Sequence, residues 1–162
     1  MLAASEFSGA EPMLIDDKTQ EFEAGWVYYY QSAQYIHSGD PQDGLLGNAP
    51  LFVPRNGAAP QVISYHRPPA ESIAAFLYCG NANGKPNPEI ELVGWTEGAL
   101  KVSATQAIRG SSSLGLGAAK EAVDLCLSGR PAKVRTASVM AAHELVSKLS
   151  QLGFAAKVTY GG

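Results

Sequence analysis

Residues 80–88 read GNANGKPNP, and this stretch decides how the chain is organised. Glycine, asparagine and proline favour turns, and they oppose both helices and continuous strand pairing. The residues on either side are patterned differently, so we place a domain boundary here. The sequence predicts a first domain over residues 13–80, a linker over 81–88 and a second domain over 89–160, with residues 1–12 as a leader outside both folds.

The composition supports two small packed domains. Of 162 residues, 46% are hydrophobic and 17% are charged, so a buried core is feasible and general disorder is excluded. Residues 1–80 contain three Lys and Arg against nine Asp and Glu (3 − 9 = −6), whereas residues 81–162 contain nine against six (9 − 6 = +3). The acidic half is thus suited to a basic partner surface, although ordinary solvation explains the difference equally well.

The chain carries no evident sign of a membrane or secretory protein. No apolar run approaches the roughly 20 residues that a membrane helix needs, and the first residues lack a secretory signal. Two cysteines, Cys79 and Cys126, are too few for a disulfide framework or a tetrahedral metal site. We therefore expect a cytoplasmic protein with reduced thiols, no metal or other cofactor and no membrane partner.

Hydrophobic periodicity predicts an α+β fold in both halves. In the first half, residues 19–31 alternate as one long strand with Trp26 in the core, residues 50–54 and 61–66 form a hairpin, and a helix over 68–79 covers the antiparallel sheet. The second half predicts a compact β-α-α-β-α-β domain. Its strands are expected over 89–95, 133–137 and 154–160, and its helices over 100–109, 115–128 and after a cap at Ser138.

No catalytic constellation stands out. The glycine-rich stretch 111–117 follows a helix and lacks the Lys-Ser/Thr pair of a phosphate loop, so a tight turn between helices is the better interpretation. His37, His66 and His143 have no partner at catalytic or ligand spacing. The aromatic residues lie in the acidic half, which opposes phosphate binding, so they are expected to pack in cores and interfaces. We predict a binding protein that is neither an enzyme nor specific for nucleic acid.

Residues 14–78 resemble the immunity protein 35 family. The resemblance is carried by EFEAGWVYYYQS at 21–32, YIHSGD at 35–40, LGNAPLFV at 46–53 and the closing strand at Ile63 with the helix after it. Members of this family are small cytosolic proteins encoded beside bacterial polymorphic toxins, which they neutralise by direct binding. The resemblance implies an immunity protein whose partner is a cognate toxin. An ADP-ribosyltransferase and a papain-like peptidase both remain open as the toxin's chemistry.

The loop over residues 37–48 is the predicted toxin contact, because exposed loops carry specificity and acidic groups suit basic clefts. Its candidate contact residues are His37, Asp40, Asp43 and Asn48. Since no residue is set up as a nucleophile or base, we expect inhibition by occlusion of the toxin's active-site cleft.

Residues 89–160 are similar to the C-terminal domain of the bacterial ribosomal stalk protein, which recruits translational GTPases. The similarity is carried by Lys101-Val102, AIRG at 107–110, LGL at 114–116, AKEAV at 119–123 and LGFAAKV at 152–158. It implies a docking surface made by Lys101, Val102, Arg109 and Lys120.

This surface departs from the stalk pattern at Thr105, Gln106 and Gly117, where the family has an apolar residue and lysines. We therefore expect weak binding or none to ribosomes and translational GTPases, and instead a contact with the toxin or with the first domain. The alternative is a translation-associated or chaperone-like accessory protein that meets a translational GTPase or the ribosome through this half.

Overall fold

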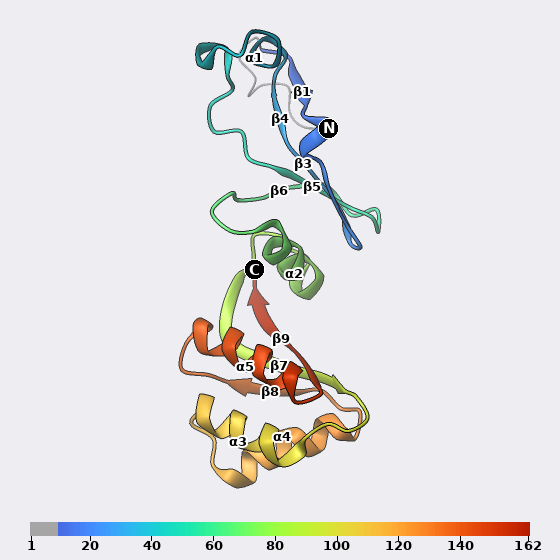
Figure 1. Cartoon of the computed structure of the whole chain (residues 1–162), viewed down its shortest axis with the longest axis vertical. Coiled ribbons are helices and arrows are strands. Elements are labelled where there is room, and N and C mark those ends of the chain that lie inside the picture. Colours follow the sequence, from blue (N-terminus) through green and yellow to red (C-terminus); the bar gives the residue numbers. More distant parts are fainter. Residues whose placement is uncertain (1–9) are drawn as a thin grey trace. The chain divides into compact units, whose positions relative to one another are not determined.

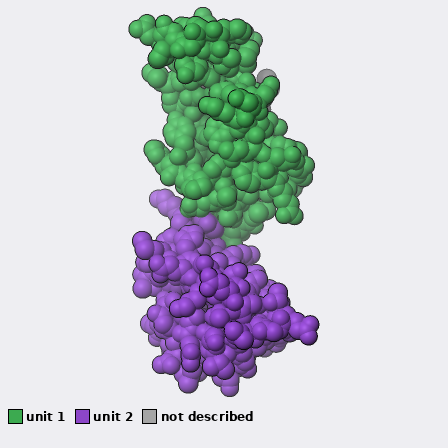
Figure 2. All heavy atoms as spheres, in the orientation of Figure 1, with its two compact units in different colours: residues 1–83 green, residues 84–162 purple. Residues whose placement is uncertain are grey.

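The computed structural model describes residues 10–162, and its contacts divide the chain into two compact units, residues 1–83 and 84–162 (Figures 1 and 2). Both units mix helices and strands, which confirms the α+β prediction. The linker expected over residues 81–88 is replaced by structure on both sides of the boundary. Ala82 and Asn83 are hydrogen-bonded to the first unit, through Gln61 and the Val62 carbonyl, while strand pairing in the second unit begins at Lys85.

The first unit contains a two-stranded and a four-stranded antiparallel sheet, ordered β1-β4 and β2-β3-β5-β6. Its elements are β1 (Pro12–Leu14), η1 (Asp16–Lys18), β2 (Gln20–Phe22), β3 (Gly25–Tyr28), β4 (Tyr30–Ser32), α1 (Ala33–Ser38), η2 (Pro41–Asp43), β5 (Leu51–Pro54), β6 (Gln61–Val62) and α2 (Pro69–Cys79).

Helix α2 packs on one face of the four-stranded sheet, as predicted. The Phe52 and Phe76 rings meet edge to face with their centroids 5.2 Å apart. Around this pair the buried core is completed by Val27, Ile63, Ile73 and Ala82. The expected hairpin forms between β5 and β6, and Gly57 in its loop takes a positive φ of 82° that suits glycine.

The single long strand predicted over residues 19–31 is wrong. The chain reverses between Phe22 and Gly25, which face each other in the β2-β3 hairpin. Gly25, where β3 begins, allows β5 to approach closely, since its φ is 154° and a Cβ there would lie 2.2 Å from the Val53 carbonyl oxygen. Val27, not Trp26, therefore points into the core.

Trp26 lies half-buried on the opposite face of the sheet, so the prediction that it belongs to the core is wrong. The Arg55 guanidinium carbon sits 4.0 Å from the centroid of its ring, and the same group forms a 2.7 Å ion pair with Glu21. Trp26 thus helps to tie β2, β3 and the end of β5 together from outside the core.

The second unit has the predicted β-α-α-β-α-β order. Its elements are β7 (Lys85–Trp95), α3 (Lys101–Ser111), α4 (Leu116–Leu127), β8 (Ala132–Arg135), α5 (Val139–Gln151) and β9 (Phe154–Gly161). The antiparallel sheet is ordered β8-β7-β9, α4 and α5 pack on it, and α3 packs against both helices (Figure 1). Ser138 caps α5 by accepting a hydrogen bond from the Ala141 amide, as predicted.

Candidate functional site

The acidic loop, which we define as residues 37–48, is held by the side chains of strand β4. The Gln31 carboxamide forms hydrogen bonds with both backbone groups of Leu45. Its oxygen accepts from the Leu45 N–H at 2.5 Å, and its nitrogen donates to the Leu45 carbonyl at 3.4 Å. The Ser32 hydroxyl caps α1 by accepting from the Tyr35 amide, and it donates to the Asp43 carbonyl. These bonds fix the loop although most of its residues are exposed.

The four predicted contact residues lie in this loop with different roles. The His37 ring nitrogen Nδ1 is 2.6 Å from the Ala33 carbonyl on its own helix, and the imidazole is exposed. Asp40 caps η2, since its carboxylate accepts from the Gln42 amide at 2.9 Å. Asp43 accepts from the Ser38 hydroxyl at 2.7 Å. Both carboxylates therefore order the loop as well as charge it.

Asn48 differs from the other three because its side chain points back to the scaffold. The Asn48 amide donates to the Tyr30 carbonyl at 2.5 Å, and the residue is only partly exposed. It therefore positions the end of the acidic loop against β4. A direct contact with a partner is better suited to His37 and Asp40, which are open to solvent.

Sequence reasoning missed the apolar side chains of this region. Leu46 is 97% exposed, and Tyr35 and Ile36 on the preceding helix are 37% and 40% exposed. The available signal was a Leu-Leu pair enclosed by Gly44 and Gly47 within an otherwise polar loop. Large apolar groups at the surface often mark interaction sites when they cluster.

A second candidate surface is a groove between α3 and α4, which we call the basic groove. Its volume is about 390 Å³, and its lining brings together all four predicted residues of the second unit. It is lined by Lys101, Val102, Thr105, Gln106, Arg109, Leu116 and Lys120.

The basic groove combines cationic and apolar groups. Val102 is 70% exposed and Leu116 58%, while the Lys101 ammonium is paired with Asp124 at 2.5 Å. Arg109 and Lys120 form no ion pair with another residue in the described part of the chain, so they supply the uncompensated positive charge. The Thr105 hydroxyl donates to the Lys101 carbonyl at 2.9 Å and is buried, so it needs no partner from outside.

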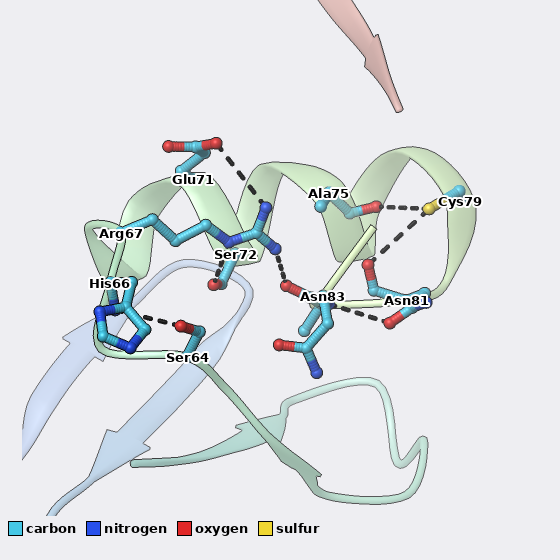
Figure 3. A network of polar contacts seen from close by, with 10 residues as sticks. Ser64, His66, Arg67, Glu71, Ser72, Ala75, Cys79, Asn81 and Asn83 are labelled. Atoms are coloured by element: carbon cyan, nitrogen blue, oxygen red, sulfur yellow. Dashed lines mark hydrogen bonds and ion pairs between the residues drawn. The ribbon is translucent and has the colours of Figure 1, made fainter. Parts of the chain in front are cut away.

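A polar network at the start of α2 holds this helix to neighbouring segments of the first unit (Figure 3). The Arg67 guanidinium donates to the Ser72 hydroxyl at 3.0 Å and to the Ala82 carbonyl, and it lies 3.7 Å from a Glu71 carboxylate oxygen. His66 lies beside this network and contributes its backbone N–H, which donates to the Ser64 hydroxyl at 3.1 Å. The network ties α2 to the last residues of the first unit.

The described residues contain no metal-binding cluster of three or more His, Cys, Asp or Glu. In the same part of the chain, none of the helices has the length and apolar character needed to span a bilayer.

A family model described as Immunity protein 35 matches residues 3–73. The match covers the sheets of the first unit, the acidic loop and the first part of α2, and it confirms the resemblance seen in the sequence for this part of the chain. The family implies an immunity protein, directed against a toxin. Comparison with curated proteins and with solved structures gives no match. The similarity of the second unit to the ribosomal stalk domain stays a prediction.

Proposed function

We propose that the chain is an immunity protein, which binds a cognate bacterial toxin in the cytoplasm and blocks its active-site cleft without catalysing a reaction. The single observation that carries this proposal is the family match over residues 3–73. The acidic loop supports it, because an ordered and exposed loop with acidic and apolar side chains is suited to enter a basic cleft. A stable complex would bury about 800 Å² on each partner.

The proposal predicts that a toxin is encoded beside this protein, and it is tested by titrating that toxin with the purified chain. We expect residual toxin activity to fall linearly and to reach its floor at one-to-one stoichiometry. Full protection at a small fraction of the toxin concentration would show turnover and would refute a stoichiometric inhibitor. A toxin that keeps its activity at excess inhibitor would refute the immunity role itself.

The contribution of the acidic loop is tested by the double variant Asp40→Asn with Asp43→Asn. Asparagine keeps the cap of η2, so the variant removes charge and preserves the loop. We expect a severalfold lower association rate at low salt, a weaker salt dependence and an unchanged melting temperature. The matched control, Asp16→Asn with Asp17→Asn in η1, removes the same charge elsewhere in the unit. If both double variants change the association rate equally, the effect comes from the net charge of the unit and not from the acidic loop.

A second candidate function is that of an accessory protein that meets a translational GTPase or the ribosome through the basic groove. The exposed Val102 and Leu116 beside Arg109 and Lys120 favour a protein contact there. The full chain and its Val102→Asp variant can be compared for capture of elongation factors from a lysate. Capture by the first and not by the second would support this function over a toxin contact at the groove.

A further inference from the structure

Leu46 is the most exposed large apolar side chain in the described part of the chain, at 97%. Single apolar residues at a surface are ordinary, but their side chains usually contact neighbouring residues, which buries part of the apolar surface. The Leu46 side chain buries almost none of its surface. Its side chain therefore contributes little to the fold of the first unit, and its presence calls for another explanation.

The backbone that carries Leu46 is fixed on both sides. Before it, Leu45 has its N–H and its carbonyl held by the Gln31 side chain. After it, Gly47 has a φ of 74°, and Asn48 is tied to the Tyr30 carbonyl. The exposure of Leu46 is thus a property of an ordered loop, which presents the side chain in one place.

Gly44 shows how closely this loop approaches α1. A Cβ at Gly44 would lie 3.2 Å from the Pro41 carbonyl and 3.6 Å from Cδ2 of Tyr35. The Tyr35 ring therefore packs beside the backbone that leads to Leu46. Tyrosine is enriched at the anchoring positions of protein interfaces, and Leu46, two residues after Gly44, adds a projecting apolar group in the same region of the chain.

The charge of this region specifies the partner's surface. The sequence between Lys18 and Arg55 contains no lysine or arginine, while Asp40 and Asp43 lie in the same loop as Leu46. A complementary surface thus has an apolar pocket and a basic rim. A second copy of this unit would bring acidic groups against acidic groups, which opposes self-association through Leu46.

We propose that Leu46 is the anchor residue of the interface: it inserts into an apolar pocket of the cognate toxin, and lysine or arginine side chains on the rim of that pocket face Asp40 and Asp43. This inference rests on the proposed function and adds to it the contact that fixes the complex. Ordering of the loop before binding lowers the entropy lost on association. Because changes at an interface act mostly on the dissociation rate, the contact made by Leu46 should slow dissociation more than it speeds association.

The test compares Leu46→Ala with the control Leu77→Ala, since Leu77 is also well exposed (67%) but lies on α2. Affinity for the toxin encoded beside this protein is measured by calorimetry or surface plasmon resonance, and folding by thermal unfolding. We expect Leu46→Ala to raise Kd at least tenfold, mostly through faster dissociation, with an unchanged melting temperature. Leu77→Ala should match the wild type in both measurements.

Three outcomes would overturn the inference, and they differ in what they say of the proposed function. If the wild type binds the toxin and Leu46→Ala binds equally well, the anchor is wrong and the immunity role stands. If the wild type does not bind the toxin, the proposed function and the anchor both fail. If sedimentation shows a wild-type dimer and the Leu46→Ala variant is a monomer, the partner that receives the Leu46 side chain is a second copy of this chain instead of the toxin.

Discussion

Replacing Gln31 by alanine tests whether β4 holds the acidic loop in place. The variant removes the two bonds between the carboxamide and Leu45, and a third, local bond from the Ser32 amide. The bond to the Leu45 N–H is short at 2.5 Å, whereas the bond to its carbonyl is long at 3.4 Å and counts for less. A net contribution of about 0.5–1.5 kcal/mol for each well-formed bond gives a loss of about 1–2 kcal/mol.

That loss should appear as local opening of the acidic loop. A change of about 1–2 kcal/mol is a factor of about 5–30 in an opening equilibrium, so amide hydrogen exchange at Leu45 should accelerate by that factor. Amides of β3 and α2 should keep their protection, because the core does not include Gln31. The control Asn56→Ala removes a comparable side-chain bond to the Ala58 amide in another exposed loop, and it should leave Leu45 unaffected.

The same variant separates preorganisation from contact. Gln31→Ala retains Leu46 and both aspartates, so weaker toxin binding would come from ordering the loop at the moment of association. Unchanged exchange at Leu45 would refute the role assigned to Gln31. A fall in global stability with equal acceleration at all amides would show that Gln31 supports the whole unit and not the loop.

Three further predictions concern the two units separately. Gly25→Ala places a Cβ against a carbonyl oxygen of β5 at a positive φ, so chemical denaturation should show a loss of at least about 2–4 kcal/mol, and a smaller loss would refute the close approach. Ser138→Ala removes the cap of α5 and should cost about 1 kcal/mol, whereas Ser147→Ala on the exposed side of the same helix should cost little. Burial raises the pKa of the Cys126 thiol, so at pH 8 a thiol reagent should react quickly with exposed Cys79 alone, and the second thiol should appear only on unfolding.

Periodicity predicted the second unit well because local and tertiary preferences agree there. One arrangement is indicated by the apolar spacing of α3, α4 and α5, by the cap at Ser138, and by the strands β8 and β9 that precede and follow α5. Helices α4 and α5 bury their apolar faces on the sheet, and α3 buries its own against these two helices. The sheet is formed by strands whose alternation is visible in the sequence. The order of elements therefore follows from the pattern alone.

The first unit was harder to predict because its reversal has no ordinary turn signature. Glu23 and Ala24 are not turn formers, and Gly25 matters through its contact with β5, which lies far along the chain. The period-two pattern continued across the hairpin, so it assigned Trp26 to the wrong face. The order in the acidic loop was likewise invisible, since it comes from Gln31 and Asn48, whose partners are backbone atoms.

The two candidate surfaces differ in sign, and this limits how one partner can use both. The acidic loop has no lysine or arginine, whereas in the basic groove Arg109 and Lys120 form no ion pair with another described residue. A pocket with a basic rim attracts the first surface and repels the second. A toxin whose active-site cleft binds the acidic loop therefore needs a separate acidic region for any contact with the basic groove. Under the proposed function, the groove is thus better suited to strengthen or select the complex than to block catalysis.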